Sequence, residues 1–271
     1  MDRIPTFIIS LDRESERFKN TVAQFPKHRD YFTVVPAVYG DKLPAKEYFN
    51  YILNSDHRLL ITPAQVGASL SHMRALEMFL ASGADRALIL EDDATGSDTA
   101  LEYIYKSALE LRGEFFLHCG AFYFIKAYVK KNKNLPNGIY DLYLSRGFVC
   151  AQCYVVTRKT AETILKKQKK IMEPADEWLK LLKGSGISTY FTGAMWHVDL
   201  RKTSVRHSAT ESESVQVRQT SVIGISTSKI SQAAYNFIWK PIDKVMCELH
   251  RFAIRISAYS KGYKRVYAYN L

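Results

Sequence analysis

The sequence predicts an α/β fold with a mostly parallel central sheet. Short apolar runs typical of strands alternate along the chain with segments of helical periodicity. The 271 residues are 47% hydrophobic, which suffices for a sizeable core. We expect one domain over residues 1–202, a Ser/Thr-rich loop or linker over 203–234, and a basic, aromatic, amphipathic helical tail over 235–271.

The chain begins with a predicted strand, helix and strand. Residues 6–11 (TFIISL) and 32–36 (FTVVP) are apolar and rich in β-formers, and the polar run after the first of them opens a helix. The next helix begins at Thr62, which is expected to cap it, with Pro63 in the first turn and Gln65 completing a capping box. Apolar residues then recur at intervals of three and four.

Further elements follow in alternation. Strands are predicted at residues 87–90, 114–119 and 148–157, and helices at 99–111, 159–170 and 174–182. The strand at 87–90 is followed directly by three acids, Glu91-Asp92-Asp93.

These three adjacent carboxylates suggest a binding site. Like charges raise one another's pKa, and isolated charges are disfavoured away from water. A bound Mg²⁺ or Mn²⁺ removes both penalties, and such ions usually bridge to phosphate oxygens. Ligands of open α/β sheets bind at the carboxyl ends of strands, where these acids are predicted to lie. The alternative is that Asp92 and Asp93 cap the following helix and that Glu91 stays in solvent.

The formal net charge of +11 favours an acidic partner, such as a nucleic acid, an anionic membrane surface or a phosphorylated substrate. Residues 239–271 contain seven Lys/Arg and two acids, interleaved with aromatic residues. The apolar stripe over 238–256 is typical of a helix that lies in a membrane interface, and docking of the stripe on the domain is the alternative. The basic residues form no recognisable nucleic-acid motif, so we expect no nucleic acid partner.

The sequence suggests a cytoplasmic protein that is peripheral on the inner face of the cytoplasmic membrane. No stretch approaches the roughly 20 consecutive apolar residues that span a bilayer, and the N-terminal apolar run is far shorter than the about 7–15 residues of a signal peptide. The cysteines are too few and unevenly spaced for a disulfide scaffold, and the CAQC segment at 150–153 is expected to be structural.

Several blocks of the sequence, taken in order, resemble glycosyltransferase family 25, the lipopolysaccharide and lipooligosaccharide glycosyltransferases. The blocks are IISLDRESER near the N-terminus, PAVYGDKL near residue 40, TPAQVGASLSHMRAL at 62–76, ALILEDDA at 87–94, FFLHCGA at 115–121, CAQCYVVTRKTAETIL at 150–165 and PADEWL at 174–179. The pair GxSLSH and ILEDD carries most of the specificity, and the resemblance covers about residues 4–205.

The resemblance implies a GT-A-like fold, a UDP-sugar donor (often UDP-galactose), a lipid-linked oligosaccharide acceptor and inversion at the anomeric carbon. It makes Glu91-Asp92-Asp93 look like the acidic metal motif of such enzymes. Asp93, together with Asp92, would ligate a Mn²⁺ or Mg²⁺ ion that bridges the donor diphosphate. Asp92 and Glu91 would support it, with a neighbouring acid in contact with the ribose or a metal-bound water. His197 or His207 would supply a late metal ligand.

Inversion by a single displacement requires a base that takes the proton of the acceptor hydroxyl. Asp176 and Glu177 are the first candidates, with Asp176 preferred. A carboxylate of the three-acid cluster is another candidate, and a purely structural role at a helix N-terminus is the alternative.

Residues in two other blocks are candidates for substrate contacts. His72, in the block GASLSHMRAL, is placed in the substrate site, with a structural helical histidine as the alternative. Ser10, Arg13 and Arg17, at and after the end of the first strand, are candidates for donor contacts, Arg13 and Arg17 to the diphosphate or uracil. The alternative for the two arginines is a solvated helix face.

The chain departs from the family pattern at two positions. Gln65 stands where the family usually has an acid, and Glu91 replaces an Asp as first member of the acidic motif. Two other interpretations therefore stay open: a catalytically lapsed, membrane-associated relative, which Gln65 motivates, and a basic nucleic-acid-binding protein, which the net charge motivates.

Overall fold

The computed structural model describes residues 3–53, 61–121, 126–145, 148–197 and 252–267. The expected linker at 203–234 and the first part of the tail, 235–251, lie outside these residues. No described helix is long and apolar enough to cross a membrane.

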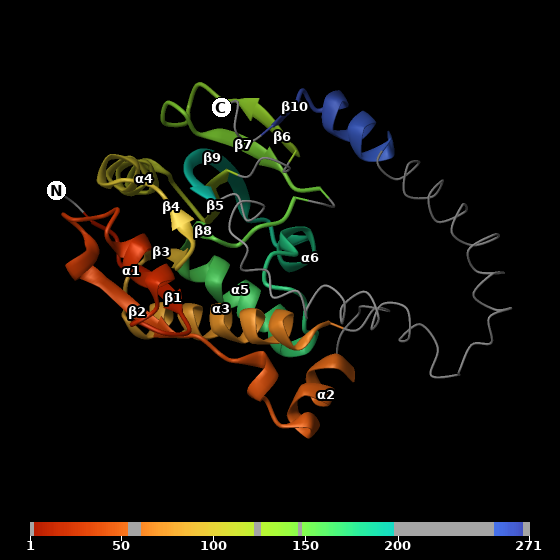
Figure 1. The fold of residues 1–271 in the computed structure, drawn as a ribbon. Coiled ribbons are helices and arrows are strands. Elements are labelled where there is room, and N and C mark those ends of the chain that lie inside the picture. Colours follow the sequence, from red (N-terminus) through yellow and green to blue (C-terminus); the bar gives the residue numbers. More distant parts are fainter. Residues whose placement is uncertain (1–2, 54–60, 122–125, 146–147, 198–251, 268–271) are drawn as a thin grey trace, which may run out of the picture.

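A ten-stranded sheet forms the centre of the protein (Figure 1). Its order is β10-β6-β7-β9-β5-β8-β3-β1-β2, and the short β4 pairs with β9. The strand bounds are β1 Thr6–Ser10, β2 Phe32–Pro36, β3 Arg86–Glu91, β4 Ala94–Thr95, β5 Phe115–Ala121, β6 Lys126–Lys131, β7 Tyr140–Tyr143, β8 Cys153–Thr157, β9 Ser188–His197 and β10 Lys264–Tyr267.

The central strands run mostly in one direction, as the sequence predicts. β1 is parallel to β2 and β3, and β5 is parallel to β9. β8 lies antiparallel between β3 and β5, so that β3 and β5 point the same way and end at the same edge of the sheet. Beyond β9, strands β7, β6 and β10 add an antiparallel edge.

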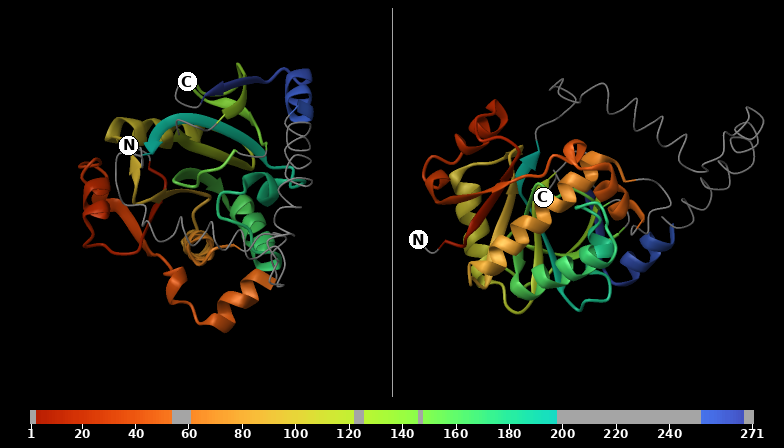
Figure 2. Two further views of the ribbon diagram at one scale, coloured as in Figure 1. Left: turned by 45° about the vertical axis from the view of Figure 1, so that its right-hand side comes forward. Right: turned by 90° about the horizontal axis from the view of Figure 1, so that it is seen from below.

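Helices cover both faces of this sheet (Figure 2). Their bounds are α1 Glu16–Val22, α2 Ala45–Leu53, α3 Pro63–Ala81, α4 Asp98–Glu110, α5 Arg158–Lys170 and α6 Trp178–Leu182, with 3-10 turns η1 Arg29–Tyr31 and η2 Gly40–Lys42. Strand β3 shows why two faces need cover: Ala87 and Ile89 pack with α3, α5 and α6, whereas Leu88 and Leu90 pack with α1 and α4. All four side chains are fully buried.

Most predicted elements lie where the sequence places them, and two are shorter than expected. The strand expected at 148–157 begins only at Cys153, because Cys150 adopts a left-handed backbone with φ of 98°. The helix expected at 174–182 is restricted to α6. Helix α2, strand β9 and the β6–β7 hairpin are not among the predicted elements.

The end of the tail belongs to the sheet. Residues 252–260 are helical, and β10 then pairs with β6. Ala258 is fully buried and the hydroxyls of Ser257 and Tyr143 lie 3.0 Å apart, so this helix is anchored on the β6–β7 hairpin. Phe252 and Ile256, the described end of the apolar stripe, are nevertheless more than half exposed.

Two glycines let the loop after β2 lie directly on α3. A Cβ atom on Gly67 would lie 2.6 Å from both the Gly40 nitrogen and the Val38 carbonyl oxygen. A Cβ atom on Gly40 would lie 1.7 Å from the Pro63 carbonyl oxygen. Only glycine allows such an approach of two backbones, which explains the glycines in the blocks PAVYGDKL and GASLSH.

We predict that Gly67→Ala destabilises the protein. An alanine normally stabilises a helix interior by about 1 kcal/mol relative to glycine. Here the added methyl group meets backbone atoms that cannot turn aside, so the free energy of unfolding in urea should fall by about 1–3 kcal/mol. Ala68→Gly, at an exposed position of the same helix, measures the propensity term alone. A gain in stability for Gly67→Ala would contradict the tight contact.

Candidate active site

The three acids lie at the carboxyl end of β3, beside the end of β1. Asp92 is 8% exposed. Its Oδ2 atom accepts a hydrogen bond from Ser10 Oγ at 2.5 Å, and its Oδ1 atom lies 2.6 Å from Arg17 Nε. Arg17 Nη2 lies 2.9 Å from Asp93 Oδ2, so one guanidinium group bridges both aspartates. The structure thus brings Ser10 and Arg17 into contact with the aspartates, while a contact of these residues with a donor stays a prediction.

Asp92 is held at a raised pKa. Burial is the main cause, and the neighbouring charges of Asp93 and Glu91 act in the same direction. Arg17 and the hydrogen bond from Ser10 oppose this shift. The backbone oxygen of Asp92 also accepts a hydrogen bond from Thr21 Oγ1 at 2.6 Å, which ties α1 to the same edge.

The aspartates do not cap the following helix, so that alternative is wrong. Ser97 is the N-cap residue of α4, and its hydroxyl accepts a hydrogen bond from the Ala100 amide. Asp92 and Asp93 precede this cap and face α1 instead. The acidic cluster therefore needs an explanation other than helix capping.

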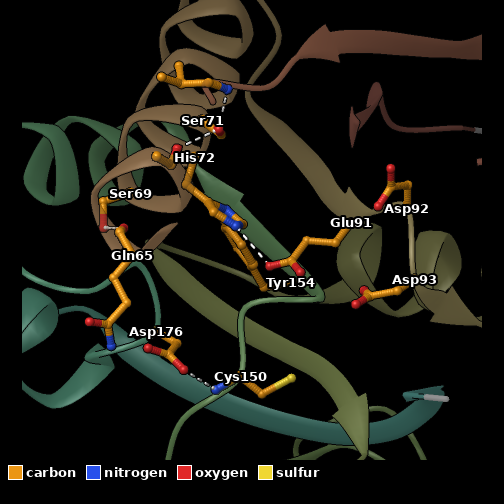
Figure 3. A network of polar contacts seen from close by, with 12 residues as sticks. Gln65, Ser69, Ser71, His72, Glu91, Asp92, Asp93, Cys150, Tyr154 and Asp176 are labelled. Carbon is orange, nitrogen blue, oxygen red and sulfur yellow. Dashed lines mark hydrogen bonds and ion pairs between the residues drawn. The ribbon is translucent and has the colours of Figure 1, made fainter. Parts of the chain in front are cut away.

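His72 links helix α3 to the first acid (Figure 3). Its Nε2 atom lies 3.0 Å from Glu91 Oε1, and its Nδ1 atom lies 2.9 Å from the Tyr154 hydroxyl. Because an ionised carboxylate only accepts, Nε2 carries the proton, and in the neutral ring Nδ1 accepts from Tyr154. Burial raises the pKa of Tyr154 well above its usual value, which keeps this hydroxyl protonated.

Other residues of the GASLSH block hold α3 in place. Ser69 Oγ donates to the Glu173 carbonyl oxygen at 2.8 Å, and Ser71 Oγ accepts a hydrogen bond from the Val38 amide at 2.8 Å. Gln65 is exposed, and its Oε1 atom accepts from the Thr62 amide at 3.0 Å. The predicted capping box is thereby confirmed, and the residue that departs from the family pattern serves the helix start.

Asp176 reaches the site through Cys150. The Cys150 amide donates to Asp176 Oδ2 at 3.1 Å, and the Cys150 carbonyl accepts from Trp178 Nε1 at 2.9 Å. His118 Nε2 lies 2.8 Å from the same carbonyl oxygen. Burial lowers the pKa of His118 to about 4, so this ring is neutral near pH 7. These contacts hold Cys150 in its left-handed conformation.

Acids from two distant segments influence the Cys150 thiol through their charges. Its pKa is raised well above the usual value, first by burial and then by the charges of Glu91, Asp93 and Asp176. Figure 3 shows the Asp176 carboxylate turned toward the Cys150 amide. The charge of Asp176, the preferred base candidate, and the charges of Glu91 and Asp93 therefore act on the same thiol.

For the other predicted site residues within the described part of the chain, the structure gives a position in the fold but no contact with the acids. Glu177 is the N-cap residue of α6, and Arg13 is exposed between β1 and α1. The backbone of His197 pairs with Ala94, next to the acids. The side chain of His197 and all of His207 lie outside what the structure describes.

Glu91 and Asp93 place carboxylate oxygens at this edge, the kind of ligand that Mg²⁺ and Mn²⁺ prefer. Among the described residues, no group of three His, Cys, Asp or Glu side chains could hold a metal ion. Protein partners already engage both carboxylate oxygens of Asp92, Asp93 Oδ2 and Glu91 Oε1, so Asp93 and Glu91 would bind a cation beside Arg17 and His72. Mg²⁺ and Mn²⁺ are commonly held by one or two carboxylates together with phosphate oxygens and water.

Sequence reasoning missed three residues of this site. Thr21, Cys150 and Tyr154 contact it through partners far along the chain. Tyr154 lies in an apolar strand, and nothing in the local sequence indicates its hydrogen bond to a helix 82 residues away.

Solved structures resemble this chain only weakly. The inositol-1-phosphate CTP transferase from T. maritima is 10% identical, with a TM-score of 0.41 over 80% of this chain and 97% of that chain. The mannose-1-phosphate geranyltransferase from Thermus thermophilus is 11% identical, with a TM-score of 0.38 over 71% and 74%. Both scores are too low to carry an argument. No curated protein matches the chain.

The comparison with protein families identifies the family of this chain. The model of glycosyltransferase family 25, described as an LPS biosynthesis protein, matches residues 3–179. This span contains the strand that carries the acids, the α3 block with His72, and the segment with Asp176. The chain belongs to glycosyltransferase family 25.

Proposed function

We propose that the protein transfers a hexose, most readily galactose, from a UDP-sugar to a lipooligosaccharide or lipopolysaccharide acceptor, with inversion at the anomeric carbon. Family membership supports a glycosyltransferase of LPS biosynthesis. The observation that carries the proposal is the acidic edge at the carboxyl end of a buried strand, where Asp92 and Asp93 meet Arg17 and Glu91 meets His72.

The acidic edge suits a diphosphate bound through a cation. Asp93, supported by Glu91, would hold a Mn²⁺ or Mg²⁺ ion, while Asp92 keeps Arg17 in position. When bound, the ion would supply Lewis-acid stabilisation of the negative charge on the departing UDP. Arg17 is about half exposed, so its guanidinium group can also meet a phosphate. Ser10 is bonded to Asp92, and Arg13 is exposed in the segment between β1 and α1.

Asp176 is our candidate for the base that takes the acceptor proton. Its charge acts on the Cys150 thiol together with the charges of Glu91 and Asp93, and the hydrogen bond from the Cys150 amide fixes one of its oxygens. Glu91 is the second candidate. His72 touches Glu91 and is oriented by Tyr154, so we assign His72 the role of a positioning residue.

We predict that Asp93→Asn lowers kcat/KM for UDP-galactose by at least about 100-fold, because it removes the anionic ligand at the charge that develops on the leaving group. Turnover with a truncated lipooligosaccharide acceptor in the presence of MnCl₂ measures this. Chelation with EDTA should stop the wild type, and added Mn²⁺ should restore it. Glu110→Gln, at the end of α4, is the matched control. Undiminished turnover of Asp93→Asn would refute the metal role.

We predict that Asp176→Asn lowers kcat by about 10²–10⁴-fold, the usual contribution of a general base. Asparagine retains an oxygen for the Cys150 amide, so the fold should persist. The affinity for UDP, measured by calorimetry, should not change. Glu177→Gln and Glu91→Gln are measured beside it. If Glu91→Gln alone abolishes turnover while Asp176→Asn retains it, Glu91 is the base.

We also propose that the protein binds the cytoplasmic face of the inner membrane through its tail. Phe252, Ile256 and Tyr259 follow one another at helical spacing and are all more than half exposed. Arg255 and Lys261 lie among them. Exposed apolar residues flanked by basic ones match a surface of anionic lipid, where apolar burial and electrostatic attraction act together.

Replacing both Phe252 and Ile256 with glutamate should abolish most co-sedimentation of the full chain with phosphatidylglycerol vesicles. The exchange removes apolar surface and adds charges that anionic lipid repels. Leu109→Glu, at an exposed position of α4, is the control. Vesicle binding equal to that of the wild type would exclude this face as the contact.

A further inference from the structure

Gln152 lies at the acidic edge, between the ends of β3 and β5. The Glu91 amide donates to the Gln152 carbonyl oxygen at 2.8 Å, which continues the β3–β8 register one pair beyond Leu90 and Cys153. Paired residues of antiparallel strands share a face, about 5 Å apart. The side chain of Gln152 therefore lies on the face that carries Glu91 and, two residues further along β8, Tyr154.

The amide group of Gln152 is buried and has no hydrogen-bond partner in the part of the chain that the structure describes. The residue is 1% exposed, and neither Nε2 nor Oε1 has a hydrogen-bond partner among the described residues. Burying an amide in this way is unfavourable, and nearly all buried polar groups in proteins are paired. An amide kept in this state at a binding edge indicates a partner that arrives with the substrate.

The neighbouring strand leaves room for this amide. A Cβ atom on Gly120 of β5 would lie 2.7 Å from Gln152 Nε2. A side chain at position 120 would therefore have to displace this amide. Strands β3, β8 and β5 thus place this amide at the edge where the acids lie.

A second buried glutamine, Gln168, differs from Gln152 because both atoms of its amide group are hydrogen-bonded. Gln168 is 4% exposed, and both of its amide atoms are used by Glu173. Its Nε2 atom donates to the Glu173 carbonyl at 3.0 Å, and its Oε1 atom accepts from the Glu173 amide at 2.9 Å. Gln152 is equally buried but lacks such contacts within the described part of the chain.

We propose that Gln152 binds the hexose of the donor through neighbouring hydroxyl groups and so contributes to the choice of sugar. An amide offers two N–H donors and one acceptor, and a sugar hydroxyl both donates and accepts. A phosphate would satisfy only the N–H groups and leave Oε1 unpaired. This inference rests on the proposed function, since the sugar would be attached to the diphosphate that the acids hold.

The test compares Gln152→Leu with Gln168→Leu in the full chain. Calorimetry with UDP-galactose, UDP-glucose and UDP gives the affinities, and thermal unfolding without ligand gives the stability. Gln152→Leu should weaken binding of the preferred UDP-sugar by about 10-fold, with unchanged affinity for UDP and an unchanged or raised melting temperature. Gln168→Leu should lower the melting temperature, since it leaves two backbone groups of Glu173 unpaired, and should keep the preference for UDP-sugar over UDP.

Three results would overturn the inference. UDP-sugar binding as in the wild type, or an equal loss of UDP affinity, would show that Gln152 does not contact the hexose. A lower melting temperature of Gln152→Leu with unaltered sugar discrimination would show that the amide has a structural partner. If the wild type itself binds neither UDP nor UDP-sugars, the proposed function fails together with the inference. If the wild type and Gln152→Leu bind the UDP-sugar equally well, the inference alone is rejected.

Discussion

The guanidinium group of Arg17, which lies against both Asp92 and Asp93, is the interaction on which the acidic edge depends. Two adjacent carboxylates at the end of a buried strand repel each other and lose hydration, and burial dominates the raised pKa of Asp92. The ion pairs with Arg17 offset part of this unfavourable free energy. Because Arg17 belongs to α1, they also hold α1 beside the end of β3. The hydrogen bond from Thr21 to the Asp92 backbone adds a second link between the same two elements.

Helix α3 connects the other parts of the site. Ser69 reaches the segment before α6, Ser71 holds the loop after β2, and His72 reaches the sheet. Successive helical residues point about 100° apart, so a short run can contact three different partners. This explains why so much of the family resemblance is concentrated in a few residues of one helix, and why glycine is needed where the helix meets a backbone.

The sequence predicts the elements with a strong local pattern. The strand that ends in the acids and the capped helix α3 are examples, because an apolar run and a capping box need no tertiary information. Strand β9 was missed, since its polar residues and internal glycine weaken the strand pattern. The pairing of Arg17 with two aspartates and the approach of Asp176 to the acids depend on how α1 and β8 are placed. Such distances cannot be read from the local sequence. The sequence alone therefore also allows a helix-capping role for the aspartates and a solvated helix face for Arg17.

The pairing of β10 with β6 has a consequence for the order in which the protein is assembled during synthesis. Strands β6 and β7 are made long before residues 264–267, so one edge of the sheet stays open until this late segment returns to it. Such a distant pairing carries a loop-closure cost that slows its formation. The nascent protein therefore passes through a period in which the site-bearing strands can be complete while the β6 edge is available to other chains.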